Sequence, residues 1–202
     1  CQSPHLRDIL HLFNRTAIEV CEGQQLDMDF ESQAEVTISE YMEMIRLKTA
    51  VLLAASLKTG ALVAGTSPDE ANRIYNFGIN IGLAFQLMDD LLDVYSDEAL
   101  FGKKTGNDIL TNKKTFLYLK AFELAGDDMK ATLKKAFTLT DPVLKIETVT
   151  ALYDQLGVKE ATLSEIRRLH DTVEPFFSTL PQGVESSEEL HQLTLGLVAR
   201  QF

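Results

Sequence analysis

The stretch GINIGLAFQLMDDLLDVYSD, residues 78–97, places Asp89, Asp90 and Asp93 in a segment that is otherwise almost entirely apolar. Apolar residues occupy nearly all sides of a helix drawn through this segment, which predicts a central helix rather than a surface one. Burying three carboxylates on such a helix costs several kcal/mol each unless their charge is compensated. The stretch therefore predicts both an all-α core and a site within it.

The polar side chains of this helix share one face. At about 100° per residue from Asp89, Asp93 lies at about 40°, Gln86 at about 60° and Asp90 at about 100°. The same stripe carries no side chain one and two turns earlier, at Gly82 and Gly78. These glycines either open a groove or permit close contact with another helix.

A hard divalent cation is the simplest compensation for the three carboxylates. Mg²⁺ favours carboxylate oxygens and commonly binds one or two of them together with water and substrate phosphate. A metal that bridges to diphosphate also explains how an acidic protein holds an anionic substrate. The alternative is an ordinary solvated acidic face, although acids near a helix C-terminus oppose the helix dipole.

The composition predicts one all-α domain over residues 1–202. The chain has 45% hydrophobic residues, few Gly and Pro, no Trp and a formal net charge of −11. This charge argues against a nucleic-acid binder, which needs basic residues against phosphates. Cys1 and Cys21 give no disulfide framework or metal-ligand spacing, so a cytoplasmic location is expected. No apolar run reaches the roughly 18 to 20 residues of a membrane span.

Hydrophobic periodicity and helix-capping residues predict about eight helices and no strand. The first is expected to end at Gly23, and residues 96–111, with two glycines and two adjacent lysines, are expected to form a functional loop. The helices are expected at about 4–22, 39–64, 68–95, 112–125, 127–138, 141–156, 159–179 and 186–199.

Four motifs occur in this order: GQQLDMDFE at 23–31, RLKTAVLLAASLKTGALVAG at 46–65, the aspartate stretch at 78–97, and FGKKTGNDILTNKKTFLYLKA at 101–121. Their order and spacing resemble the trans-isoprenyl (polyprenyl) diphosphate synthases, the family that contains farnesyl and geranylgeranyl diphosphate synthases. The resemblance covers residues from about 12 to 125. It implies an isoprenoid synthase-type helical bundle.

The resemblance implies that Asp89, Asp90 and Asp93 form the family's second aspartate-rich motif, which holds Mg²⁺ against an allylic diphosphate. Lys48, Lys103 and Lys113 would contact that diphosphate, and the compact ammonium group of lysine suits this task. The alternative for the last two residues is that they are exposed loop lysines.

Lys48, Thr49 and Gln86 are the catalytic residues that the resemblance implies. A threonine inside a helix can bond back to a preceding carbonyl and bend the helix. In the family, such a bend lets the Lys-Thr backbone and hydroxyl stabilise the allylic cation together with a glutamine, matched here by Gln86.

Gln24, Asp27 and Phe85 would line the allylic site. Gln24 and Asp27 match the family's Gly-Gln-x-x-Asp segment, for which a turn and helix cap is the alternative interpretation.

The reaction implied is a prenyl transfer. Mg²⁺ assists ionisation of the allylic diphosphate, the cation attacks the double bond of isopentenyl diphosphate, and a proton is lost. A homodimer is expected by resemblance. The family's first aspartate-rich motif does not occur in residues 1–22, so we hypothesise that the chain is the C-terminal portion of a synthase and is inactive alone.

Other classes compete with this interpretation. A class I terpene cyclase would need Asn or Asp, Ser or Thr, and Glu at spacings that Asp90, Asp93 and Asp97 fit poorly. A non-catalytic partner subunit of a heteromeric prenyl synthase is the second alternative. Ferritin-like di-iron chemistry would need two Glu-x-x-His motifs, and only Glu188–His191 qualifies.

Overall fold

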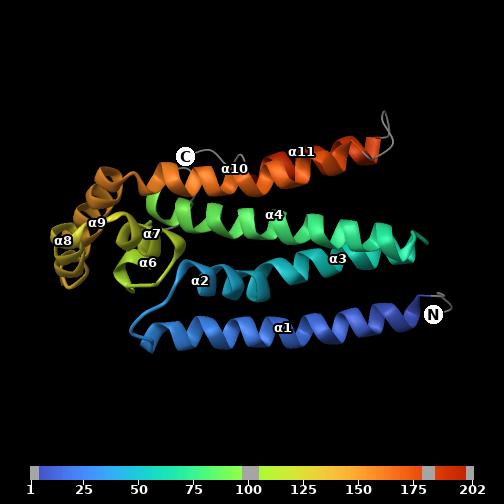
Figure 1. The fold of residues 1–202 in the computed structure, drawn as a ribbon, viewed down its shortest axis with the longest axis horizontal. Coiled ribbons are helices and arrows are strands. Elements are labelled where there is room, and N and C mark those ends of the chain that lie inside the picture. Colours follow the sequence, from blue (N-terminus) through green and yellow to red (C-terminus); the bar gives the residue numbers. More distant parts are fainter. Residues whose placement is uncertain (1–4, 97–104, 179–184, 199–202) are drawn as a thin grey trace.

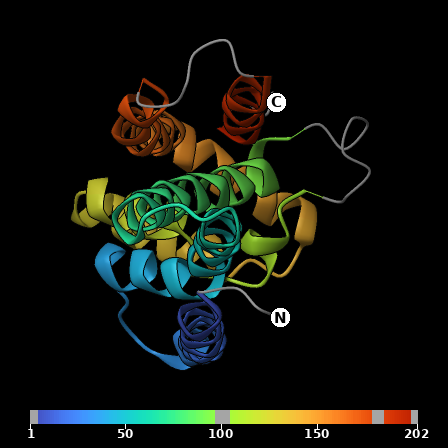
Figure 2. The same cartoon turned by 90° about the vertical axis from the view of Figure 1, so that its right-hand side faces the viewer.

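The computed structural model describes residues 5–96, 105–178 and 185–198, and within these ranges the chain is helical with no strand. The predicted all-α fold is therefore confirmed. In Figure 1 the long helices lie side by side, while α6 to α9 gather at one end. Figure 2 looks along the long axis and shows α3 and α4 between α1 on one side and α10 and α11 on the other. No helix in the described ranges is long and apolar enough to cross a membrane.

The helices have the following bounds: α1 Leu6–Ser32, α2 Ile38–Ile45, the π-helical segment η1 Arg46–Ala50, α3 Val51–Val63, α4 Pro68–Tyr95, α6 Asn107–Leu110, α7 Phe116–Leu124, α8 Asp127–Phe137, α9 Pro142–Leu156, α10 Val158–Phe177 and α11 Glu185–Val198.

Helix α4 is the predicted aspartate helix, and its predicted bounds are confirmed. Ser67 is its N-cap, Pro68 occupies the first turn, and Ser67 and Glu70 form a reciprocal capping box. The helix packs against α3, η1 and α10 and contributes buried residues along its whole length. It is the central helix that its apolar composition predicts.

The predicted end of the first helix at Gly23 is wrong, because α1 continues to Ser32. Gly23 is buried where α1 crosses η1, and a Cβ there would lie 2.4 Å from the backbone nitrogen of Lys48. Glycine at this position allows two helices to approach closely and does not end the helix. Consequently Gln24 and Asp27 lie on a helix rather than in a connecting segment.

The helix expected at 39–64 is present but is divided by η1. It begins at Ile38, one residue before the expected start, and Thr37 is its N-cap and forms a capping box with Glu40. In η1 the backbone N–H of Val51 donates to the carbonyl of Arg46, five residues earlier. The α-helical hydrogen-bond pattern is therefore interrupted at Lys48 and Thr49. Short π-helical turns within α-helices are often found at functional sites.

Of the loop expected at 96–111, residues 97–104 lie outside the described residues, and residues 107–110 form α6. The helices expected after it are found within a few residues of their predicted bounds, apart from a later start at Phe116 for α7. Because η1 divides one helix and α6 adds another, the described ranges contain more helical segments than the eight expected.

Gly78 and Gly82 permit close helix contact, which was one of the two roles expected for them. A Cβ at Gly78 would lie 2.6 Å from Cα of Ala54, and one at Gly82 would lie 2.6 Å from Cα of Ala50. Backbone therefore meets backbone along α4, η1 and α3. This contact fixes the aspartate end of α4 relative to Lys48 and Thr49.

Candidate active site

The three aspartates of α4 have different surroundings. Asp89 is exposed and Asp93 is half-buried, whereas Asp90 is only 3% exposed. Asp89 and Asp90 point about 100° apart around the helix axis, so one side chain meets solvent and the other enters the core. Asp89 and Asp93 therefore face outward together, and Asp90 faces the interior.

Asp93 is joined to α6. Its Oδ2 accepts a hydrogen bond of 2.9 Å from the backbone N–H of Asp108. Burial raises the pKa of Asp93, the backbone N–H groups of Asp108 and Asn107 lower it, and the charge of Asp89 raises it further. The first turn of α6 is thus fixed against the end of α4, and the side chain of Asp108 is brought to the same region.

Asp108 is a site residue that the sequence interpretation missed. Burial and the charge of Asp93 raise its pKa to about 6, while Lys113 lowers it. Its position in the GND segment, within a loop already expected to be functional, was the available signal. Carboxylates that crowd in this way favour binding of a cation.

Lys113 lies among these carboxylates. Burial alone would lower its pKa, but the charges of Asp108, Asp27, Asp90 and Asp89 raise it above the ordinary value. Its backbone N–H donates to the carbonyl of Asp108 at 2.9 Å. Lys113 therefore stays charged where α1, α4 and α6 meet.

Lys48 of η1 and Asp27 of α1 are brought together. The Nζ atom of Lys48 donates to Oδ2 of Asp27 at 2.6 Å, and both side chains are partly buried. This ion pair joins two residues that lie 21 positions apart in the chain. Both were predicted from the sequence to belong to one site.

Thr49 and Gln86 are also in contact. The hydroxyl of Thr49 donates to Oε1 of Gln86 at 3.0 Å, and Nε2 of Gln86 donates to Oδ1 of Asp90 at 3.1 Å. The expectation that Thr49 bends its helix by bonding back to a carbonyl is wrong, because its hydroxyl is directed to another helix. The helix departs from α geometry through η1 instead.

The remaining predicted residues are more peripheral. Gln24 is exposed on α1, and Phe85 is half-buried one turn before Asp89 on α4. Lys103 lies outside the described residues.

The donor chemistry of the site suits Mg²⁺, although the residues form no complete cage. Within residues 5–96, 105–178 and 185–198, no three His, Cys, Asp or Glu side chains are placed to hold one metal ion. Mg²⁺ commonly takes only one or two carboxylates and completes its octahedron with water and phosphate. The outward-facing carboxylates of Asp89 and Asp93 meet that requirement.

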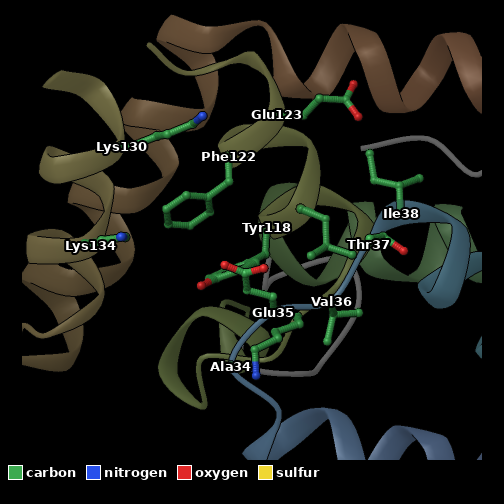
Figure 3. A pocket seen from close by; sticks show the side chains of 12 residues that line it. Ala34, Glu35, Val36, Thr37, Ile38, Tyr118, Phe122, Glu123, Lys130 and Lys134 are labelled. Carbon is green, nitrogen blue, oxygen red and sulfur yellow. The ribbon is translucent and has the colours of Figure 1, made fainter. Parts of the chain in front are cut away.

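A cavity of about 500 Å³ lies elsewhere, between residues 34–38, α7 and α8. Figure 3 shows Lys130 and Lys134 of α8 facing Phe122 and Tyr118 across it. Glutamates and lysines both line the cavity, so it does not select one sign of charge, and none of the predicted site residues lines it.

Comparison with known proteins shows the family of this chain and how much of its relatives' length the chain covers. The polyprenyl synthetase profile matches residues 2–156. The short chain isoprenyl diphosphate synthase of Methanothermobacter thermautotrophicus is 40% identical over 158 residues, which are 78% of this chain and 48% of that protein. The chain therefore spans about half the length of the curated relatives that it matches.

Solved structures show the same fold. A crystal structure of a geranylgeranyl pyrophosphate synthase superimposes with a TM-score of 0.89 at 41% identity, covering all of this chain and 63% of the other. The geranylgeranyl pyrophosphate synthase of Corynebacterium glutamicum, solved with isoprenyl diphosphate and magnesium, gives a TM-score of 0.88 at 29% identity, covering 100% of this chain and 57% of the other.

Proposed function

The chain belongs to the polyprenyl synthetase family, and we propose that it forms the part of a prenyltransferase that binds and ionises an allylic diphosphate. The co-substrate would be isopentenyl diphosphate, and the product would be a prenyl diphosphate longer by one isoprene unit. The observation that carries the proposal is the meeting of carboxylates and ammonium groups from α1, η1, α4 and α6 at the C-terminal end of α4.

Mg²⁺, when bound, would neutralise diphosphate charge and assist its departure. Asp89 and Asp93 would hold it, because their carboxylates face outward and its remaining positions suit water and phosphate oxygens. A related synthase solved with isoprenyl diphosphate and magnesium supports the choice of metal.

Lys48 and Lys113 would bind the diphosphate, with Lys103 as a further candidate. The ionisation breaks the allylic C–O bond, and the diphosphate leaves with the electron pair. Ammonium groups beside the leaving group therefore stabilise the transition state more than the ground state. The Nζ atom of Lys48 donates to Asp27 at 2.6 Å, and this contact orients the ammonium group towards the site.

Thr49 and Gln86 would stabilise the allylic cation through oxygen lone pairs. The π-helical segment η1 places Thr49 next to Gln86 of α4. Loss of a proton after the new C–C bond has formed completes the transfer. Phe85, Gln24 and Asp27 would line the allylic site, and assembly as a homodimer stays a prediction.

Prenyl products measured by mass test this proposal. The 202-residue chain and the complete product of its gene are incubated with Mg²⁺, isopentenyl diphosphate and each short allylic diphosphate. We expect prenyl transfer by the complete product, reduced at least about 100-fold by Asp89→Ala and unaffected by Asp171→Ala, whose side chain is 81% exposed on α10. Absence of prenyl products from both proteins would contradict the proposal and favour a non-catalytic partner subunit.

A further inference from the structure

Tyr41 and Asp90 form a polar contact inside the core. Tyr41, in the first turn of α2, is 2% exposed and Asp90 is 3% exposed. The Tyr41 hydroxyl donates to Oδ2 of Asp90 across the α2–α4 contact. Burial and the neighbouring charge of Asp90 raise the pKa of Tyr41 well above its ordinary value, so this hydroxyl stays a donor.

The second oxygen of Asp90 is also occupied. Oδ1 accepts from Nε2 of Gln86 at 3.1 Å, one turn earlier on α4. Both oxygens of Asp90 therefore accept hydrogen bonds, and the nitrogen end of the Gln86 amide is the end that faces Asp90. The amide oxygen of Gln86 is thereby turned towards Thr49, whose hydroxyl donates to it at 3.0 Å.

These hydrogen bonds join three elements and converge on Asp90 as the final acceptor. Tyr41 of α2 and Gln86 of α4 both donate to Asp90, and Thr49 of η1 donates to Gln86. The single hydroxyl proton of Thr49 is used in this chain. Towards any other neighbour, Thr49 therefore offers only oxygen lone pairs, and such lone pairs attract a cation.

We propose that Tyr41 and Asp90 are positioning residues, which fix the Gln86 amide so that Thr49 and Gln86 present oxygen lone pairs to the reacting allylic carbon. In this arrangement Asp90 acts through its hydrogen bond to Gln86. The outward-facing Asp89 and Asp93 bind the metal. The inference deepens the proposed prenyl transfer and rests on it for the identity of the cation. The arrangement of the amide does not depend on that reaction.

The side-chain amide of Gln86 can be observed directly by NMR in the 202-residue chain without metal or substrate. The Gln86 Nε2H₂ pair is assigned with Gln86→Met. We expect Tyr41→Phe and Asp90→Asn to shift and broaden this pair, because its carboxylate partner loses its position or its charge. Tyr153→Phe is the matched control, since Tyr153 is also 2% exposed and has no contact with Gln86 or Asp90 among the hydrogen bonds of the described residues. A Gln86 pair that is unchanged by Tyr41→Phe overturns the proposal.

A second readout separates positioning from metal binding. The affinity for inorganic diphosphate is measured calorimetrically with Mg²⁺ for Asp90→Asn, Tyr41→Phe and Asp89→Asn. We expect a loss of about 10- to 100-fold for Asp89→Asn only. A loss of the same size for Asp90→Asn would make Asp90 a metal ligand and contradict its assignment.

In the complete gene product, the positioning role predicts a fall in kcat of about 10- to 100-fold for Tyr41→Phe, with KM for the allylic diphosphate little changed. Loss through misfolding would instead appear in the far-UV circular dichroism and thermal unfolding of the variant. If the wild type neither binds diphosphate nor transfers a prenyl group, the proposed function fails. The Gln86 resonances still decide the positioning role.

Discussion

At the scale of single residues, the site places like charges in a partly buried space. Burial and the nearby carboxylate of Asp93 raise the pKa of Asp108 to about 6, and burial raises the pKa of Asp90 to about 7. Such crowding costs stability in the free protein. A bound cation would recover that cost, so the same like charges that oppose folding favour binding of a metal.

Asp108 gives a pH-dependent prediction. Its pKa is higher in the folded chain than in the unfolded chain, so the folded state binds more protons between about pH 4 and pH 6. Stability from this group is therefore present at low pH and is lost as the pH rises through about 6. We expect Asp108→Asn to raise the free energy of unfolding at pH 7 by about 1 to 2 kcal/mol, measured by urea denaturation.

Urea denaturation of the wild type and Asp108→Asn at pH 4 is the control. The gain in stability from Asp108→Asn should nearly disappear at that pH. Asp171→Asn, at an exposed position on α10, should change stability little at either pH. An effect of Asp108→Asn that is equal at both pH values would contradict the assigned shift in pKa.

Lys48 gives a second prediction, because the chain contains its own control. The Lys-Thr dipeptide occurs twice, at 48–49 and 58–59. Lys58 donates to Oδ1 of Asn72 at 2.7 Å on the surface, whereas Lys48 lies beside Asp27 at the site. We expect Lys48→Met to weaken Mg²⁺-dependent diphosphate binding about 10- to 100-fold and Lys58→Met to leave it unchanged. An equal loss of diphosphate affinity in both variants would show a non-specific effect of charge and would contradict the role of Lys48.

At the scale of elements, the site depends on how closely α4 approaches η1. Gly82 lies against Ala50 of η1, two positions from Lys48, and one turn before Gln86 on α4. Side chains at this crossing would push the two helices apart. The distance between Thr49 and Gln86 is therefore set by a residue without a side chain.

Gly82→Ala should destabilise the fold, because the new methyl group meets backbone atoms that cannot rotate away. We expect a loss of about 1 to 3 kcal/mol, measured by urea denaturation. Gly60→Ala is the matched control, since Gly60 lies inside α3 and a Cβ there meets nothing within 4 Å. It should stabilise the chain by about 0.5 to 1 kcal/mol. Stabilisation by both substitutions would contradict the close approach.

Much of this element-level arrangement could be predicted from the sequence. The capping residues Ser67 and Glu70 located the start of α4, and its apolar composition predicted that it is central. The predicted helix end at Gly23 was wrong, because a glycine at a helix crossing and a glycine at a helix end look alike in sequence. Tyr41 could not be found as a site residue, since an aromatic residue in a helix is ordinarily part of the core.

At the scale of the whole molecule, the site is assembled from elements that are distant in sequence. Asp27 and Lys48 lie 21 positions apart, and Tyr41 and Asp90 lie 49 positions apart. Helical periodicity predicts which residues share a helix face, but it does not predict which faces of different helices meet. The resemblance to a known family placed Asp27 and Lys48 in one site, but nothing in the sequence paired Tyr41 with Asp90.

We propose that this chain itself supplies a metal-dependent diphosphate site. Calorimetric titration of the 202-residue chain with inorganic diphosphate, once with Mg²⁺ and once with EDTA, measures that dependence. We predict saturable binding with Mg²⁺ that is lost with EDTA and weakened about 10- to 100-fold by Asp89→Asn. Binding that is equal in EDTA, or that is unchanged in Asp89→Asn, would contradict the claim.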